Sequence, residues 1–400
     1  MSKPTNPGDD DGIRTVCVVV TARPSYSRVR SLLRAIEEHP KLRLRLIVGA
    51  SAVLERYGAV VDVMRADGFE PDASVYMVVE GENLVTMAKS TGLGVVELAT
   101  LFDNYEPDVV VTIADRYETI ATAIAASYLN IPVAHVQGGE VTGSIDEKVR
   151  HAVTKLSNIH FVANDRAARW VIRMGEHPED VHEVGCPSID VAEAVAASPA
   201  LDFDPFERYG GVGTAFDIGA EPYLVVMQHP NTTEEADARL QMTETIEAIG
   251  ELDRPTFWFW PNVDAGSDGS SKAIRSFRES GRAGRIYFVK NMTPEDFLRL
   301  LVNSACIIGN SSVGIRECSF LGVPAVNIGT RQQGRERGPN VTDVPHDRDA
   351  IQAAVEAQLA HGHHPPSGVY GEGRAGERIA DLLASLPLGI DKRLTYEDAP

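Results

Sequence analysis

Along residues 15–185, short apolar runs rich in valine and isoleucine alternate with longer segments whose apolar residues recur at helical spacing. The apolar runs are continuous, which is typical of parallel strands that are covered on both faces. Helical patterns fill the intervals, so this part of the chain predicts a doubly wound α/β domain. The predicted strands are residues 15–21, 43–49, 108–114, 131–137, 159–163 and 181–185.

A second series of the same kind follows, after a stretch around residues 195–220 whose Gly-, Pro- and Asp-rich composition predicts a linker. We therefore expect an α/β fold of two Rossmann-like, doubly wound parallel-sheet domains, with the active site in the cleft between them. The strands predicted in the second series are residues 223–228, 256–261, 285–290, 305–310 and 324–329.

The expected organisation is a disordered tail over residues 1–12, an N-terminal domain over 13–205 and a C-terminal domain over 206–390. The tail is polar and rich in Pro, Gly and Asp, unlike a signal peptide. The last helical pattern, residues 378–386, is mildly amphipathic, and we expect it to pack on a domain surface, the N-terminal domain being one choice.

Composition and charge narrow the class of protein. An apolar content of 43% over 400 residues is enough for two hydrophobic cores. The net charge of −19 argues against binding to nucleic acid or to an acidic membrane. The four cysteines are widely spaced and form neither a zinc nor a disulfide pattern. We expect a soluble, cytoplasmic protein with no metal and no other cofactor.

In the first series, polar groups stand where predicted strands end. Arg23 precedes Pro24 at a strand-to-helix turn, and a guanidinium beside a helix N-terminus suits a diphosphate. Arg23 could equally be an ordinary solvent-exposed arginine on a turn. Asp115 and Arg116 follow another strand, where partial burial raises a carboxyl pKa and a neighbouring arginine lowers it. Asp115 could instead be only the N-cap of the next helix.

The segment HVQGGEVTGSIDEKVRHAVTKL, residues 135–156, places two glycines and several charged residues after a strand. Glycines let the main chain approach a ligand closely. Asp146 lies four residues before Arg150, and Glu147 four before His151, so both pairs can meet along a helix. Such pairs are often only surface ion pairs, but the position at the rim of the expected cleft favours a site. The candidates are Gln137, Glu140, Asp146, Arg150 and His151.

In the second series, residues 309–312 (GNSS) join a strand to a helix that carries Glu317. Small residues with free N–H groups at a helix start form a phosphate nest, and a carboxylate one turn later can accept hydrogen bonds from a ribose diol. No P-loop or G-x-G-x-x-G pattern is present there, which disfavours ATP and nicotinamide. Further polar residues at strand ends are His229, Asn262 and Arg331.

Eight segments, in this order, resemble the signature segments of the UDP-N-acetylglucosamine 2-epimerase family, most closely its hydrolysing branch in sialic acid and nonulosonate synthesis. The resemblance implies a GT-B-like fold with a UDP-sugar in the cleft. The segments are ADRYE, HVQGGEVTGSIDEKVRHAVTKL, VGCPSID, QHPNTT, PNVDAGS, GNSSVGIRE, NIGTRQQGRE and YGEGRAGERI.

Carried over by position, the resemblance assigns UDP to a set of side chains and places the main chain near Met292 beside the uracil. It assigns proton transfer to Asp115, Gln137 and Asp146. Arg150 and His151 would border the substrate. The UDP contacts would be Arg23, Ser27, Arg116, His229, Asn262, Ser311, Ser312, Glu317 and Arg331.

The chain departs from the family pattern at two positions. A glutamate is common where Gln137 stands, and glutamine cannot exchange a proton at neutral pH. Either Glu140 does that work or Gln137 only positions the sugar. Relatives often carry an acidic residue in place of Ser25, so the sugar is left open between N-acetylglucosamine and a relative such as diacetylbacillosamine.

The implied reaction releases UDP and a ManNAc-type sugar from UDP-GlcNAc and water, through a 2-acetamidoglucal. The implied assembly is a homodimer or homotetramer. Three alternatives stay open: a non-hydrolysing 2-epimerase that returns UDP-ManNAc, a GT-B glycosyltransferase, and an inactive nucleotide-sugar-binding protein. Gln137 is the one feature that favours the inactive protein.

Overall fold

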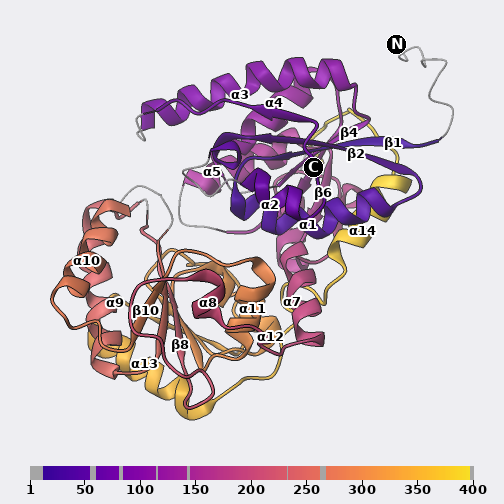
Figure 1. Ribbon diagram of the computed structural model, residues 1–400. Coiled ribbons are helices and arrows are strands. Elements are labelled where there is room, and N and C mark those ends of the chain that lie inside the picture. Colours follow the sequence, from indigo (N-terminus) through magenta and orange to yellow (C-terminus); the bar gives the residue numbers. More distant parts are fainter. Residues whose placement is uncertain are drawn as a thin grey trace. The chain divides into compact units, whose positions relative to one another are not determined.

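The computed structural model describes residues 12–54, 60–80, 84–113, 116–141, 145–231, 233–261 and 267–396, with main chain only for Leu84, Ile145 and Asp146. The chain divides into two compact units (Figure 1). Unit 1 comprises Met1–Glu140, Ile145–Asp190 and Gly373–Pro400. Unit 2 comprises Val141–Ser144 and Val191–Glu372.

Unit 1 is built on a seven-stranded sheet in the order β3-β2-β1-β4-β5-β6-β7, and all of its strand pairs are parallel. The order reverses between β1 and β4, so the chain winds outward from that point in both directions. The strands are β1 (Arg14–Val20), β2 (Leu42–Gly49), β3 (Ala73–Val75), β4 (Val109–Ile113), β5 (Val133–Val136), β6 (Ile159–Val162) and β7 (Val181–Glu183).

Strand β1 shows why its apolar run is continuous. Val16, Val18 and Val20 face one hydrophobic core, whereas Cys17 and Val19 face a second core on the other side of the sheet. Successive side chains of a strand point to opposite faces, so a strand that is covered on both faces needs an apolar residue at every position.

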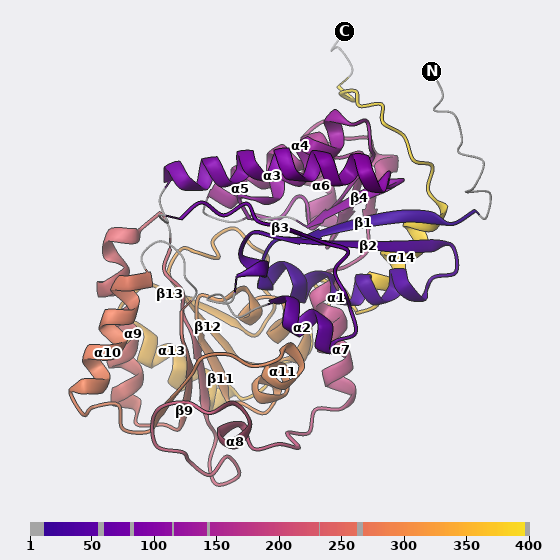
Figure 2. The same cartoon turned by 45° about the horizontal axis from the view of Figure 1, so that its top comes forward.

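Helices cover both faces of this sheet (Figure 2). The first core is closed by α1, α2 and α14, and the second by α3, α4 and α5. Helix α7 begins in unit 1 and ends in unit 2. The helices are α1 (Arg23–Glu38), α2 (Val60–Ala66), α3 (Leu84–Tyr105), α4 (Thr119–Tyr128), α5 (Ile145–Leu156), α6 (Asp165–Arg173), α7 (Pro187–Ala197) and α14 (Ala375–Ser385).

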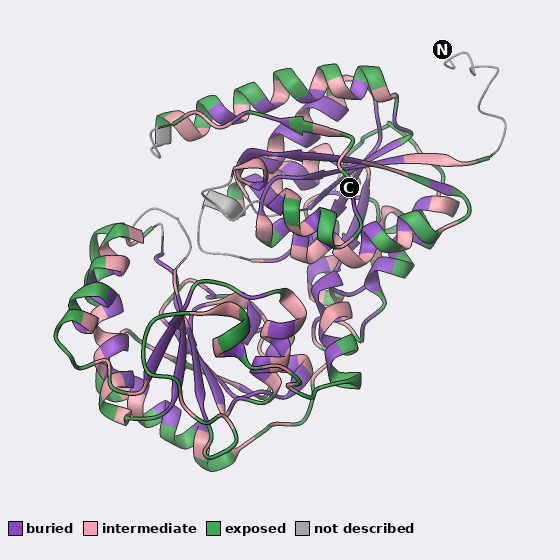
Figure 3. Ribbon diagram, viewed as in Figure 1, coloured by how far each residue is buried: buried purple, intermediate pink, exposed green. Residues whose placement is uncertain are grey.

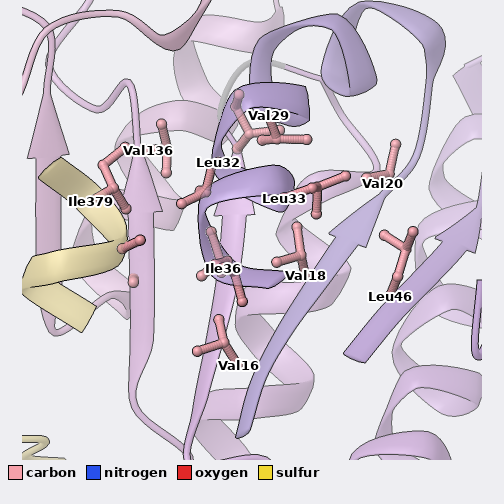
Figure 4. Packing of buried hydrophobic residues seen from close by; sticks show 14 of the residues in the cluster. Val16, Val18, Val20, Val29, Leu32, Leu33, Ile36, Leu46, Val136 and Ile379 are labelled. Carbon is pink, nitrogen blue, oxygen red and sulfur yellow. The ribbon is translucent and has the colours of Figure 1, made fainter. Parts of the chain in front are cut away.

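Helix α1 presents Val29, Leu32, Leu33 and Ile36 to the sheet, at the spacing of one helix face (Figure 4). Ile379 of α14 belongs to the same core. The Asp190 carboxylate accepts the main-chain N–H groups of residues 375 and 376, at 2.8 Å each, and so holds the start of α14. The last helix is therefore part of unit 1, although it follows unit 2 in the sequence.

Unit 2 has a six-stranded parallel sheet in the order β10-β9-β8-β11-β12-β13, which reverses between β8 and β11. Its strands are β8 (Leu224–Met227), β9 (Thr256–Phe259), β10 (Ile286–Val289), β11 (Cys306–Gly309), β12 (Ala325–Ile328) and β13 (Val341–Val344). Its helices are α8 (Pro205–Tyr209), α9 (Ala238–Leu252), α10 (Ser267–Glu279), α11 (Pro294–Val302), α12 (Glu317–Leu321) and α13 (Arg348–His361).

The stretch around residues 195–220 is more ordered than the expected linker. It contains the end of α7 and all of α8, and Phe206 packs into one of the two cores of unit 2. Val212 exchanges two main-chain hydrogen bonds with Phe288 of the edge strand β10, at 2.8 and 2.9 Å. The linker interpretation is wrong for this part, because its aromatic residues supply the apolar contacts that hold it on the sheet.

Both units have the parallel, doubly covered sheet that the sequence predicts. All four cysteines are buried and free of disulfides. Within the described ranges, no helix combines the length and the apolar character needed to cross a lipid bilayer.

Candidate functional site

In a parallel sheet, ligands bind beyond the carboxyl ends of the strands, at the point where the strand order reverses. In unit 2 this point lies between β8 and β11. His229 follows β8, Ser311 follows β11, and Arg331 follows the neighbouring strand β12. Three of the predicted UDP residues are thus brought to one edge of one sheet.

Asn310 ties these three loops together. Its Oδ1 accepts the main-chain N–H of His229, and its Nδ2 donates to the carbonyl of His229, both at 2.7 Å. Its own carbonyl accepts Arg331 Nη1 at 3.1 Å and Gln332 Nε2 at 2.9 Å. Asn310 is almost fully buried. The GNSS segment predicts Asn310 in this loop, but its role depends on contacts between distant segments, which a local pattern does not indicate.

The His229 side chain is buried and stands near the Arg331 guanidinium. Burial, with a smaller contribution from Arg331, lowers the pKa of the imidazole to about 3. At neutral pH, His229 is therefore an uncharged hydrogen-bonding group beside a fixed positive charge.

The GNSS segment makes a tight turn in which Gly309 is essential. Its φ is +134°, and a Cβ there would lie 2.2 Å from the Met227 carbonyl oxygen, so a larger residue does not fit. Ser311 Oγ accepts the N–H of Val313 at 3.4 Å, and Ser312 Oγ accepts Arg316 Nη2 at 2.9 Å.

The helix expected after this turn is broken in two. A 3-10 turn spans Ser312–Gly314, and α12 begins only at Glu317. Arg316 is buried and binds Ser312, so it belongs to the turn. Oε2 of Glu317 is buried and has no hydrogen-bond partner in the described part of the chain. Such an oxygen can accept a hydrogen bond from a ligand hydroxyl.

Met292, another predicted UDP residue of unit 2, is separate from this group. Met292 is buried in the loop after β10, two strands away from β8. Its main-chain N–H donates to the Asn291 side chain at 3.0 Å. Asn262, predicted after β9, lies outside the described residues.

In unit 1 the strand order reverses between β1 and β4, and Arg23 and Arg116 follow these two strands. Helix α1 starts at Arg23, and its N-cap residue Ala22 offers no capping side chain. A helix N-terminus with an arginine beside it suits an anion, as expected for a diphosphate site. Ser27 Oγ donates to the Arg23 carbonyl at 3.2 Å, so this hydroxyl is engaged within its own helix.

Arg116 is held by a residue that the sequence analysis did not single out. Its Nε donates to Oε1 of Glu118 at 2.7 Å. Glu118 is 1% exposed, and its Oε2 is buried without a hydrogen-bond partner in the described part of the chain. The preceding candidate, Asp115, lies outside the described residues. The signal in the sequence was a glutamate two residues after an arginine at a strand end.

The loop after β5 carries Gln137 in a left-handed conformation with φ of +65°. Its Nε2 donates to Cys186 Sγ at 2.7 Å, and Cys186 Sγ lies 3.0 Å from Ser188 Oγ. A Cβ on the nearby Gly139 would lie 2.3 Å from the Ala167 carbonyl oxygen. The loop therefore packs too tightly for larger residues, and Gln137 is anchored through a cysteine that sequence reasoning missed.

Helix α5 secures the end of this loop. Arg150 is buried, and its Nη1 donates to the Glu140 carbonyl at 2.9 Å and to the Glu147 carboxylate at 3.2 Å. The predicted pair of Glu147 and His151 is present, with 3.1 Å between Oε1 and Nε2. The side chain of Asp146, the other predicted partner of Arg150, lies outside the described residues.

As for metals, no group of three or more His, Cys, Asp and Glu side chains within the described ranges is arranged to hold an ion. The candidate groups include arginines and buried carboxylate oxygens, which suit a ligand with an anionic part and several hydroxyls.

The sequence model of a family described as UDP-N-acetylglucosamine 2-epimerase matches residues 34–384. The chain is 32% identical to a "UDP-N,N'-diacetylbacillosamine 2-epimerase (hydrolyzing)" of Legionella pneumophila, over 94% of this chain and 97% of that protein. It is 30% identical to "Polysialic acid biosynthesis protein P7" of Escherichia coli, over 86% and 85% of the two chains.

Among solved structures, the fold matches a UDP-GlcNAc 2-epimerase from Neisseria meningitidis, which was crystallised with UDP-GlcNAc. The TM-score is 0.74 at 16% identity, over 92% of this chain and 99% of that one. At this identity the likeness establishes the fold alone. The predicted GT-B-like class with two Rossmann-like sheets is confirmed.

Proposed function

The chain belongs to the UDP-N-acetylglucosamine 2-epimerase family, and we propose that it is a hydrolysing member. It converts UDP-GlcNAc, or a closely related UDP-HexNAc such as the diacetylbacillosamine derivative, and water into a ManNAc-type sugar and UDP. The observation that carries the proposal is the similarity, over nearly the whole chain, to the Legionella pneumophila enzyme whose name includes "hydrolyzing". Similarity to a polysialic acid biosynthesis protein supports a role in making such sugars.

In this proposal the strand ends of unit 2 hold the UDP leaving group. Arg331 and the N–H groups near Ser311 and Ser312 face the diphosphate, neutral His229 donates or accepts a hydrogen bond, and Glu317 accepts the ribose hydroxyls. Negative charge grows on the diphosphate as the C1–O bond breaks. Fixed positive groups therefore stabilise the transition state more than the bound substrate. The resemblance to the family also assigns Arg23, Ser27 and Arg116 of unit 1 to UDP, together with Asn262, and it assigns the main chain near Met292 to the base.

The proton transfers fall to unit 1. A carboxylate, Asp115 or Asp146, takes the proton from C2 while the C1–O bond electrons leave with UDP, which creates a C1–C2 double bond. Water then adds its oxygen to C1, and C2 receives a proton on the opposite face. A positioned base and acid contribute about 10²- to 10⁴-fold each. Arg150 and His151 border the sugar.

We propose that Gln137 positions the sugar and that Glu140 is the further carboxyl group able to act as an acid or base. The Gln137 amide cannot exchange a proton at neutral pH, and its Nε2 is engaged by Cys186. Its carbonyl oxygen is the atom suited to accept a hydrogen bond from the sugar. Glu140 is buried and keeps an ionisable carboxyl in a loop that Arg150 holds in place.

Incubation with UDP-GlcNAc alone tests the proposal, because no acceptor sugar is then present. Free ManNAc with an equal amount of UDP is the expected result, followed by NMR spectroscopy. Formation of UDP-ManNAc would assign the chain to the non-hydrolysing branch. An unchanged substrate would favour a glycosyltransferase or an inactive binding protein, and the diacetylbacillosamine nucleotide would then be the next substrate to try.

We also propose that the protein forms a homodimer or homotetramer through helix α3. Val85 and Val96 of this helix are each 63% exposed and Leu93 is 43% exposed. All three lie in α3 (Leu84–Tyr105), and Figure 3 shows much of the surface of this helix as exposed. A line of exposed apolar side chains on one helix is typical of an interaction surface.

A further inference from the structure

Helix α8 and the residues after it cover the edge of the unit 2 sheet at β10. The Phe206 ring stacks on Phe257 and meets Tyr287 edge-on, with centroid distances of 5.1 and 4.7 Å. Val212 pairs with Phe288 through two main-chain hydrogen bonds. The segment is therefore fixed on β10 both by aromatic packing and by the main chain.

From this fixed base, the Tyr209 hydroxyl reaches the loop that follows β10. It donates to Asp296 Oδ2 at 2.5 Å, accepts the Thr293 N–H at 3.3 Å, and lies 3.1 Å from Thr293 Oγ1. Burial, reinforced by the Asp296 carboxylate, raises the pKa of the Tyr209 phenol, so the hydroxyl keeps its proton at neutral pH. One hydroxyl thus joins α8 to the N-cap of α11.

Asp296 makes this junction rigid. It is 5% exposed, and its other partners are Arg208 Nη1 at 3.1 Å and Arg299 Nη1 at 3.4 Å. Thr293 caps α11 by accepting the Asp296 N–H at 3.4 Å. The short loop of residues 290–293 is consequently held by β10 at one end and by the Tyr209 contacts at the other, with Met292 between them.

We propose that Tyr209 is a positioning residue for the nucleobase: its hydroxyl holds the loop of residues 290–293 in the shape that meets the uracil. This inference rests on the proposed function, in which the main chain near Met292 lies beside that base. A main-chain surface can recognise the polar edge of uracil only if its N–H and carbonyl groups are fixed in direction. Tyr209 supplies that restraint from α8, which contains none of the residues assigned to UDP.

The variant Tyr209→Phe removes only the hydroxyl, and Tyr223→Phe is its matched control. Tyr223 is buried in the same core, and its hydroxyl donates to the Leu300 carbonyl, at 2.5 Å, near the other end of α11. UDP and CDP binding is measured by calorimetry for the wild type and both variants, at a temperature where all three are folded. The KM and kcat for UDP-GlcNAc are measured on the same samples.

We expect Tyr209→Phe to weaken UDP binding about fivefold, the effect of losing one hydrogen bond. The affinity for CDP should fall less than the affinity for UDP, so the ratio of the two affinities becomes smaller. For UDP-GlcNAc, KM should rise by a larger factor than kcat falls. Tyr223→Phe keeps both affinities within about twofold of the wild type.

Two outcomes overturn the inference, and they are distinguishable. If the wild type fails to bind UDP, the proposed function fails and the inference falls with it. If the wild type binds UDP but Tyr209→Phe retains the wild-type affinity and preference, or Tyr223→Phe weakens them equally, the inference alone is wrong. If both variants lose UDP affinity equally, the loss comes from general destabilisation of the hydrophobic core and not from the loop of residues 290–293.

Discussion

At the scale of single residues, the candidate site depends on side chains that hold the main chain in place. Asn310 bonds both main-chain groups of His229 and offers its own carbonyl to Arg331 and Gln332. Such a residue need not touch the ligand to matter. It sets the distance between groups that follow three different strands, and a change of about 1 Å there is enough to weaken binding or catalysis.

Replacing Asn310 by alanine tests this role. The change leaves the buried N–H and carbonyl of His229 without their partners, so we expect unfolding free energy to fall by about 2 kcal/mol. UDP affinity should fall at least about tenfold, because the loops that carry His229 and Arg331 lose their common anchor. Denaturant unfolding and calorimetry measure the two effects.

Asn303→Ala is the matched control. Asn303 is exposed, and its Nδ2 donates to the carbonyl of Arg299 in α11 and to the carbonyl of Pro199, which follows α7. The Asn303→Ala substitution should lower the unfolding free energy by less than about 1 kcal/mol and leave UDP binding unchanged. If Asn310→Ala behaved like this control, Asn310 would not be the anchor of the site.

The position of His229, Ser311 and Arg331 at the ends of strands was predictable from the sequence. The contacts of those residues were not. Gln137 was weighed as an acid–base group or a sugar ligand, but its amide binds Cys186, which lies far along the chain. Glu118 and Asn310 were passed over for the same reason, because a local pattern does not reveal which buried groups a distant loop brings near.

At the scale of elements, continuous apolar runs identified the central strands of both sheets. The edge strands β3 and β13 escaped prediction, because they are only partly buried and so have no continuous apolar run. The helix after GNSS was predicted as one piece, but the chain forms a 3-10 turn first.

A buried carboxylate of unit 1, that of Glu176, binds side chains from three segments, one of which is the chain after α14. Glu176, 3% exposed, binds His160 Nε2 at 3.0 Å and Lys155 Nζ at 2.5 Å, and Lys392 Nζ also donates to it. Burial by itself would raise the pKa of the Glu176 carboxyl. The hydrogen bonds from these three side chains outweigh burial and lower the pKa to about 2.

This carboxylate predicts a specific dependence of stability on pH. Its pKa falls from 4.5 to about 2 on folding, so its contribution is complete above pH 4.5 and is lost as the pH drops toward 2. The difference in unfolding free energy between the wild type and Glu176→Gln should thus shrink by about 3 kcal/mol between pH 7 and pH 2. Urea unfolding across this range measures it. A pH-independent difference for Glu176→Gln would contradict the account.

At the scale of the whole molecule, the fold and the family followed from the sequence. The alternation of apolar runs with helical patterns predicted two parallel sheets. The order of the eight motif segments indicated the family whose sequence model matches residues 34–384. The surface that we propose for assembly did not follow from the sequence, since the exposed apolar residues of α3 are recognised only when the helix is placed on its neighbours.

We expect a charge in the middle of that face to break the oligomer. Val96→Glu would place a charged carboxylate in an apolar interface, where desolvation is costly, so the protein should elute as a monomer. Leu240→Glu, on α9 of unit 2, is the control because Leu240 has the same exposure of 63%. Light scattering coupled to gel filtration gives the masses. A monomeric wild type, or an unchanged mass for Val96→Glu, would exclude this interface.

The most direct test of the central claim, elimination of UDP followed by hydration, is the reaction of UDP-GlcNAc in deuterated water. The account predicts free ManNAc that carries one deuterium at C2, released together with UDP, because the proton that leaves C2 is replaced from solvent. Mass spectrometry and proton NMR of the sugar read the label. Free sugar that retains hydrogen at C2 would contradict elimination, and labelled UDP-ManNAc as the sole product would contradict hydrolysis.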